Sequence, residues 1–146
     1  MHVLRCRWVY KYKRDHTGNV VRYKARLVIQ GFGQKFGIDF FDTFAPVARM
    51  SSIRLVLAIA AVLDLILHQL DIVTAFLEAD VEEVIIMSQP EGFVEVGPNG
   101  ERMVCRLRKS LYGLKQAPRN WNKELDSFLR NKSSQRSWIN SWSDLG

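Results

Sequence analysis

The sequence has few of the residues that would set it apart from ordinary globular proteins. Of its 146 residues, two are cysteine, four are proline and nine are glycine. Cys6 and Cys105 lie far apart and form no Cys-x-x-Cys pair, which argues against a disulfide framework and against a cysteine-based zinc site. With 47% hydrophobic, 25% charged and 11% aromatic residues, the composition excludes a disordered or collagen-like protein.

A long uninterrupted apolar segment is also missing. The most apolar stretch, residues 55–70, contains Asp64, His68 and Gln69, and it is shorter than the roughly 20 residues that a membrane-spanning helix needs. The basic residues near the N-terminus are not followed by the apolar region of a signal peptide. We therefore predict a soluble, intracellular protein without a membrane span.

The charge is divided into three blocks along the chain. Residues 1–49 and residues 102–146 each contain ten Lys/Arg and three Asp/Glu, whereas residues 50–101 contain one Lys/Arg and nine Asp/Glu. Two basic flanks around an acidic centre suit a site that holds phosphates on both sides and a cation in the middle. The alternative is an ordinary solvated surface, and the sequence alone leaves both open.

Alternating side chains predict a β-hairpin in the first third of the chain. Residues 8–14 and 20–29 alternate with a period of two, and the turn-forming residues 15–19 lie between them. Arg22, Lys24 and Arg26 share one face of the second strand because neighbouring side chains point to opposite faces. This row fits an anion-binding surface, or an exposed edge strand that its charges protect from aggregation.

The rest of the pattern predicts an α+β fold with a largely antiparallel sheet and a buried helix. The nearly continuous apolar character from Ser51 or Ser52 to Gln69 predicts a helix that is buried on most sides. Apolar residues at helical spacing after Pro118 predict a final helix. Between the helices we expect a short strand that ends at residues 70–72, a helical or turning segment at 74–80, and strands at 84–87 and 102–107. Residues 133–146 are rich in serine and have no clear period, so we predict a disordered tail there.

Asp71 is the strongest candidate for chemistry, because it lies where the predicted strand at 70–72 meets a turn. A carboxylate at this position can cap the following turn. It can also be a ligand of Mg²⁺, which binds through one or two carboxylates together with substrate phosphates and water. Two-metal phosphoryl transfer needs at least one more converging carboxylate. Several acids are close in sequence, but their spacing does not place them beside Asp71: Glu78, Asp80, Glu82 and Glu83.

Six motifs follow one another along the chain: Arg22–Val28, Gly37–Asp39, Thr43–Ala48, Gln69–Leu77, Gln89–Phe93 and Ser110–Trp121. Together they resemble the reverse transcriptase of Ty1/copia-type LTR retrotransposons over about residues 8–130. The stretch Tyr-Gly-Leu-Lys-Gln-Ala-Pro-Arg is the most specific part. The resemblance implies that residues 1–132 are the fingers and part of the palm of an RNA-directed DNA polymerase. Such an enzyme binds an RNA/DNA primer-template and a dNTP, and it uses Mg²⁺.

The resemblance also implies roles for individual residues. Asp71 matches the first catalytic carboxylate, and the backbone carbonyl of Ile72 would join it on the metal. Lys24 and Arg26 are similar to the cations that hold the triphosphate. Phe76 matches the aromatic residue that lies under the sugar and excludes a ribose 2′-OH. The segment that resembles the part facing the nascent base pair and the template contains Tyr112, Gly113, Lys115 and Gln116.

The sequence departs from this family in its carboxylates. The family's second pair lies in a Tyr-x-Asp-Asp hairpin further along, and no Asp-Asp occurs in this chain. We therefore predict a reverse transcriptase domain fragment that is inactive alone. The intact family uses Mg²⁺, but the missing carboxylates argue against Mg²⁺ binding by this chain. The fragment should expose a sheet edge and apolar surface through which copies self-associate. The alternatives are a non-catalytic nucleic-acid-binding remnant and a pseudogene product. In the intact family, the setting would be a cytoplasmic retrotransposon particle.

Overall fold

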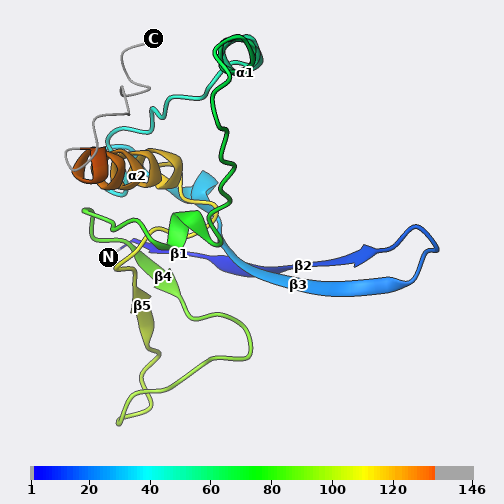
Figure 1. The fold of residues 1–146 in the computed structure, drawn as a ribbon. Coiled ribbons are helices and arrows are strands. Elements are labelled where there is room, and N and C mark those ends of the chain that lie inside the picture. The colour runs from blue at the N-terminus through cyan, green and yellow to red at the C-terminus, as the bar shows by residue number, and fades with distance from the viewer. Residues whose placement is uncertain (1, 134–146) are drawn as a thin grey trace.

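The computed structural model describes residues 2–133, which form two small sheets, two α-helices and two short 3₁₀ helices (Figure 1). In chain order the elements are β1 (Val3–Leu4), β2 (Cys6–Arg14), β3 (Val20–Ile29), η1 (Gly31–Gly33), α1 (Met50–Val62), η2 (Ala75–Leu77), β4 (Ile86–Ser88), β5 (Val104–Arg106) and α2 (Ala117–Ser133). The fold is α+β, as predicted. Apart from Ser133, the predicted tail at 133–146 lies outside the described residues.

The predicted β-hairpin is confirmed. β2 and β3 pair antiparallel along their whole length, with one irregular step between Lys13 and Arg14. The turn is held by the side-chain carboxylate of Asp15, which accepts hydrogen bonds from the backbone N–H groups of Thr17 and Asn19, both at 2.9 Å. The resulting ribbon projects away from the rest of the molecule (Figure 1).

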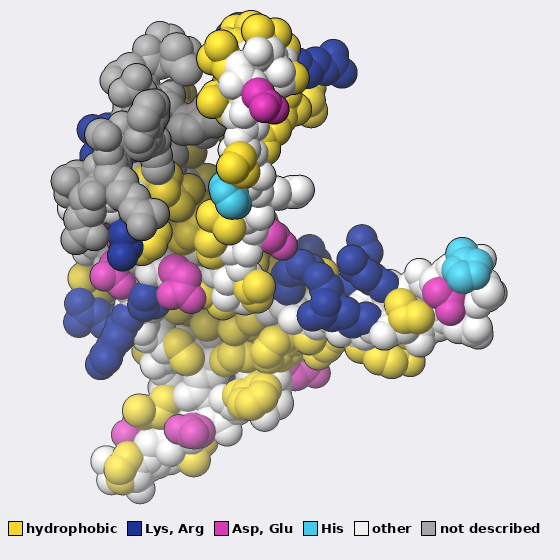
Figure 2. Space-filling model, in the orientation of Figure 1, with side chains coloured by type: hydrophobic (Ala, Val, Ile, Leu, Met, Phe, Trp, Pro, Cys, Tyr) yellow, Lys and Arg dark blue, Asp and Glu magenta, His cyan; other side chains and the backbone are white. Residues whose placement is uncertain are grey.

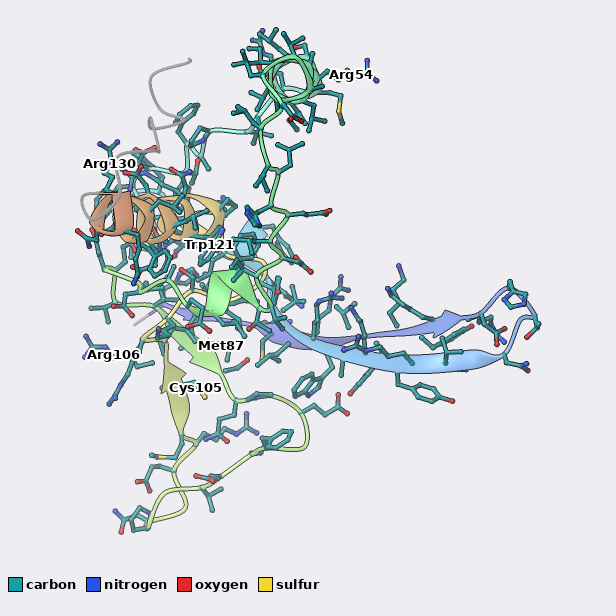
Figure 3. The ribbon with its side chains drawn as sticks, in the orientation of Figure 1. Arg54, Met87, Cys105, Arg106, Trp121 and Arg130 are labelled. Carbon is teal, nitrogen blue, oxygen red and sulfur yellow. The ribbon has the colours of Figure 1, made fainter. Side chains whose placement is uncertain are left out.

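The second sheet lies in the body of the molecule, in the strand order β1-β4-β5. β1 runs parallel to β4, and β5 runs antiparallel to it, so that Met87 pairs with Cys105 (Figure 3). The body sheet is therefore mixed, and the hairpin forms a separate antiparallel sheet, so the single, largely antiparallel sheet that was predicted is confirmed only in part. The core joins these strands to the base of the hairpin and the start of α2, through Leu4, Ile29, Ile85, Met87, Leu114 and Ala117. Because Ile29 is the last residue of β3, the hairpin is anchored in this core.

The predicted final helix is confirmed as α2. Pro118 lies in its first turn, where the missing N–H removes no helical hydrogen bond. Trp121 and Leu125 are partly buried on the side that faces the body. Arg130 and Lys132 lie in the last turn, where positive charge is favourable next to the negative end of the helix dipole.

α1 differs from the prediction in both length and burial. The helix begins at Met50 and ends at Val62 instead of continuing to Gln69, and the chain turns after it, where Asp64 has a φ of +52°. The prediction that this helix is buried was wrong. Ala60 is its single buried residue, and α1 lies apart from both sheets (Figure 1). Most of its large apolar side chains are exposed, among them Leu55, Leu57, Ile59 and Val62.

The short elements are predicted with mixed success. β4 overlaps the strand predicted at 84–87 but begins two residues later, β5 lies within the strand predicted at 102–107, and η2 confirms the turning segment at 74–80. No strand forms at 70–72, where the chain is irregular. β1 was not predicted, because two residues are too few to show alternation. Neither helix within residues 2–133 has the length and apolar character that a membrane crossing requires.

Candidate functional site

One face of the hairpin carries a cluster of positive charge, which we call the cationic face: Lys11, Lys13, Arg22, Lys24 and Arg26. In the strand register Lys11 lies opposite Lys24, and Lys13 lies opposite Arg22. β2 and β3 contain seven Lys/Arg and no Asp or Glu. Figure 2 shows the dark blue side chains gathered on this ribbon. The cluster creates a positive potential that attracts anions.

Electrostatic repulsion within the cationic face is visible at Lys24. The neighbouring charge of Lys13 lowers the pKa of Lys24 most, followed by the charges of Arg22 and Arg26. Asp71 acts on the same ammonium in the opposite direction and raises its pKa. The fold therefore brings the acidic segment that contains Asp71 toward the cationic face. Asp71 and Ile72 are both exposed, in the irregular chain between α1 and η2.

Three of the predicted site residues contact one another. The rings of Phe76 and Tyr112 meet edge to face, with their centroids 5.4 Å apart. The guanidinium carbon of Arg26 lies 5.8 Å from the centroid of the Tyr112 ring, which is a cation–π contact. Tyr112 thus connects the cationic face to the turn that carries Phe76. We call this set the Arg26–Tyr112–Phe76 group.

The backbone around Tyr112 is held against the end of the hairpin. The N–H of Ile29 donates a 2.8 Å hydrogen bond to the carbonyl of Tyr112. Gly113 has a φ of +96°, and a Cβ at this position would collide with the carbonyl of Ile29. A Cβ at Gly31 would in turn collide with the carbonyl of Gly113. Both glycines are needed for this close approach, so Gly113 contributes to the site through its backbone.

Gln116 belongs to a buried polar network beneath this segment. It is 1% exposed, and its Nε2 donates a 2.8 Å hydrogen bond to the carbonyl of Asp39. Its Oε1 accepts a 2.8 Å hydrogen bond from Nε2 of Gln34. Gln34 Oε1 then accepts the backbone N–H of Lys115, also at 2.8 Å. In this arrangement Gln116 joins neighbouring loops, and Lys115 extends over the ring of Phe40, 4.5 Å from its centroid.

Asp39 ties the same network to the N-terminal segment. Its side chain is buried, and Oδ2 accepts the backbone N–H of Lys35 at 2.8 Å and lies 2.6 Å from Nδ1 of His2. Gln34 and Asp39 were missed as site residues. They lie outside any regular element, so no periodic pattern marked them. The one available signal was the motif Gly37–Asp39, which contributed to the resemblance but suggested no role for its aspartate.

The described residues do not form a metal centre on their own. Within residues 2–133, no group of three or more His, Cys, Asp or Glu side chains lies close enough to hold an ion. Asp71 and the carbonyl of Ile72 together offer one carboxylate and one carbonyl oxygen. Two-metal phosphoryl transfer needs further converging carboxylates, so this donor set does not fit a resident pair of Mg²⁺ ions.

Comparison with known proteins establishes the class to which this chain belongs. The family described as reverse transcriptase (RNA-dependent DNA polymerase) matches residues 1–141, and the chain belongs to this family. The match confirms the resemblance that the six motifs indicated. No solved structure matches the chain significantly.

The relatives place the chain in the reverse transcriptase region of copia-type Pol polyproteins. It is 56% identical over 130 residues to the Retrovirus-related Pol polyprotein from transposon TNT 1-94 of Nicotiana tabacum, a match that covers 89% of this chain and 10% of the polyprotein. It is 45% identical over 127 residues to the Retrovirus-related Pol polyprotein from transposon RE2 of Arabidopsis thaliana, covering 87% and 9% respectively. An uncharacterized mitochondrial protein of Arabidopsis thaliana is 44% identical over 63 residues. The chain spans about a tenth of the length of the two polyproteins.

Proposed function

We propose that this chain is the part of a copia-type RNA-directed DNA polymerase that holds the incoming dNTP against the primer-template, formed by the fingers and part of the palm. Lys24 and Arg26 bind the triphosphate, and Phe76 lies beneath the sugar. The Arg26–Tyr112–Phe76 group carries this proposal, because it joins a phosphate-binding cation to the proposed sugar-binding ring through contacts of 5.8 and 5.4 Å. The protein would act in the cytoplasm, in a retrotransposon particle.

The electrostatics of the cationic face favour this function. A triphosphate would neutralise charges that now repel one another, and the lowered pKa of Lys24 is the sign of that repulsion. Arg26 offers a planar fork of donors that suits two phosphate oxygens, whereas Lys24 supplies a compact point charge. Binding would therefore gain both direct contacts and relief from like-charge repulsion.

The aromatic and polar residues position the rest of the nucleotide. The edge-to-face contact with Tyr112 fixes the ring of Phe76, so a ribose 2′-OH would meet a side chain that cannot easily move away. We assign Tyr112 to the nascent base pair. Gly113, Lys115 and Gln116 hold Tyr112 in place through the close backbone approach and the buried network.

Asp71 is proposed as the first catalytic carboxylate, with the carbonyl of Ile72 beside it. The charge of Asp71 raises the pKa of Lys24, although more weakly than the neighbouring cations lower it, which supports a location on the same side of the molecule as the cationic face. Because the described donor set does not fit two Mg²⁺ ions, we propose nucleotide binding without polymerisation for this chain by itself. The proposal therefore separates binding, which these residues can perform, from phosphoryl transfer.

Nucleotide binding is tested with a fluorescent dNTP, by anisotropy at low ionic strength and without metal. We expect Lys24→Gln and Arg26→Gln each to weaken binding about tenfold, the effect of losing one charge-assisted phosphate contact. Lys132→Gln, at the far end of α2, removes the same charge and should leave binding unchanged. The melting temperature should not fall in Lys24→Gln, because that change relieves repulsion. Equal binding by all three variants would contradict the proposed site.

Primer extension distinguishes the proposal from its alternatives. With a primer-template, dNTPs and Mg²⁺ or Mn²⁺, we expect no incorporation by this chain. Incorporation that disappears in Asp71→Ala would show that a complete catalytic set is present. A non-catalytic nucleic-acid-binding remnant would bind the primer-template but would not prefer dNTP over inorganic triphosphate. A pseudogene product would lack a cooperative melting transition.

A further inference from the structure

The second face of the hairpin carries a row of aromatic side chains, which we call the aromatic face: Trp8, Tyr10, Tyr12 and Tyr23. Tyr10 lies opposite Ala25, and Tyr12 lies opposite Tyr23 in the strand register. Side chains alternate along a strand, so this row lies on the opposite side of the ribbon from the cationic face. The nucleotide site proposed above uses none of these four residues.

The aromatic face is open along most of its length. Tyr10, Tyr12 and Tyr23 are 73%, 53% and 80% exposed. At the base of the ribbon, the ring of Trp8 stacks on Tyr10 with centroids 6.4 Å apart, and Phe93 lies 6.0 Å from Trp8 on the other side. The indole N–H of Trp8 donates a 3.0 Å hydrogen bond to the carbonyl of Glu91, which fixes this end of the row. Figure 2 shows hydrophobic surface along this side of the ribbon.

Charge indicates what kind of partner this face would accept. The two strands contain seven Lys/Arg and no Asp or Glu. One of these cations lies on the aromatic face itself, where the guanidinium carbon of Arg14 is 4.8 Å from the centroid of the Tyr12 ring. A polyanion that also carries flat rings would match both the positive charge of the strands and the exposed aromatic rings. Bases stack on aromatic side chains while the backbone phosphates follow positive charge.

We propose that the aromatic face is a stacking platform for the bases of a single-stranded nucleic acid. The rings of Tyr10, Tyr12 and Tyr23 take successive bases, and Arg14 and the cations around the ribbon edges attract the phosphates. Recognition would not depend on sequence, because every base has a flat face to stack. This inference goes beyond the proposed dNTP site, since it uses the opposite side of the hairpin and requires no nucleotide transfer.

The first test compares two probes on the unmodified full chain. An oligothymidine of about 15 nucleotides and an abasic oligonucleotide of the same length carry the same phosphates, and only the first carries bases. We expect the abasic strand to bind about tenfold more weakly or worse at the same low salt concentration. Equal affinity for the two probes would overturn the proposal and leave a purely electrostatic surface.

The second test changes the rings and keeps the charge. The triple variant Tyr10→Val, Tyr12→Val, Tyr23→Val retains side chains that favour strands. It should bind oligothymidine about tenfold more weakly, with the abasic strand and the salt dependence unchanged. The matched variant with three Tyr→Phe changes keeps the rings and should bind like the unmodified chain. Unchanged oligothymidine affinity in the valine variant, or loss in the phenylalanine variant, would overturn the stacking platform.

Two further readouts separate base stacking from unfolding of the variant and from dimerisation. If circular dichroism shows that the valine variant is unfolded, the probe comparison and the phenylalanine variant decide instead. If sedimentation shows a dimer that the valine changes dissociate, a second copy covers this face, and the proposal is wrong. Binding of the fluorescent dNTP is measured on the same variants. It should be unchanged, so failure of the stacking platform is distinguishable from failure of the dNTP site.

Discussion

Some charged side chains in this fold lie beside an opposite charge, whereas others lie mainly among charges of the same sign. Nε of Arg119 lies 2.9 Å from Oδ2 of Asp42, and this pair connects the loop after η1 to α2. Lys24 instead has cations as its main electrostatic neighbours. A paired charge can support the fold, whereas a cluster of like charges opposes it. Such a cluster is characteristic of a surface that binds an anion.

The Asp42 carboxylate should give the fold a measurable pH dependence. The backbone N–H of Phe44 lowers its pKa below 3.8 most strongly, with a further contribution from Arg119. A lowered folded-state pKa contributes stability that is complete above 3.8 and is lost as the pH falls through the folded value. Asp42→Asn should therefore lower the melting temperature at neutral pH, and its difference from the unmodified chain should vanish in strong acid.

The control for this prediction is Glu124→Gln, which removes a negative charge from α2 at a different position. Thermal melts of the three proteins are compared across the acid range. A gap between Asp42→Asn and the unmodified chain that stays constant down to pH values well below 3.8 would show that the carboxylate charge is not responsible.

The candidate site could be predicted from the sequence only in part. Alternation alone placed Arg22, Lys24 and Arg26 on one face, because that property is local. The contacts of Arg26 and of Phe76 with Tyr112 join three distant segments, so only the family resemblance could suggest them. Gln34 and Asp39 were missed because residues that form a buried hydrogen-bond network do not recur at a regular spacing in the sequence.

The difference between local patterns and contacts of distant segments also explains which helices and strands were predicted correctly. The hairpin was predicted well because its alternation, its turn and its pairing all lie within one short segment. α1 was predicted too long because the apolar character continues past Val62, although Asp64 has a φ of +52° and the helix ends before it. Its burial was predicted wrongly because burial depends on a packing partner, which the segment's own sequence does not contain.

Where Gly113 approaches the end of β3, even the addition of a methyl group should destabilise the fold. Gly113→Ala would place a methyl group against the carbonyl of Ile29 and would also strain a backbone with a φ of +96°. We expect a loss of about 3 kcal/mol or more in the free energy of unfolding, measured with urea. Tyr112 would move with it, so dNTP binding should weaken as well.

Gly18→Ala is the matched control for Gly113→Ala. Gly18 also has a positive φ, of +90°, but nothing lies within 4 Å of the position where a Cβ would be. Its replacement should cost about 1 kcal/mol from backbone strain alone. Similar losses at the two glycines would mean that the close approach to Ile29 contributes nothing.

At the scale of the whole molecule, the main feature is the apolar surface that remains exposed. Figure 2 shows hydrophobic side chains over α1, and the chain that follows it is also apolar and exposed. Leu55, Ile59 and Leu63 recur at helical spacing, and all three are exposed. Contiguous apolar surface of this kind favours association in water.

We therefore expect this chain to self-associate through α1. Sedimentation velocity should show a shift to larger species as the protein concentration rises. The double variant Leu55→Lys, Ile59→Lys places charge on the apolar side of α1 and should restore the monomer. Val94→Lys adds a charge to an exposed loop away from α1 and should not. A monomer at every concentration, or equal rescue by Val94→Lys, would count against this surface.

The separation of the hairpin from the body sheet has a consequence for the order in which the chain folds. All pairing within the ribbon is local, and such hairpins close in about 1–10 μs. The β1–β4 pairing of the body sheet cannot form until Val3 meets Ile86, which requires closure of a long loop. The ribbon should therefore be complete while the body is still a flexible chain. Pulsed hydrogen exchange during refolding should show early protection of β2 and β3 and late protection of β1. The surface that we propose for nucleic-acid binding would then be the first part of the molecule to exist.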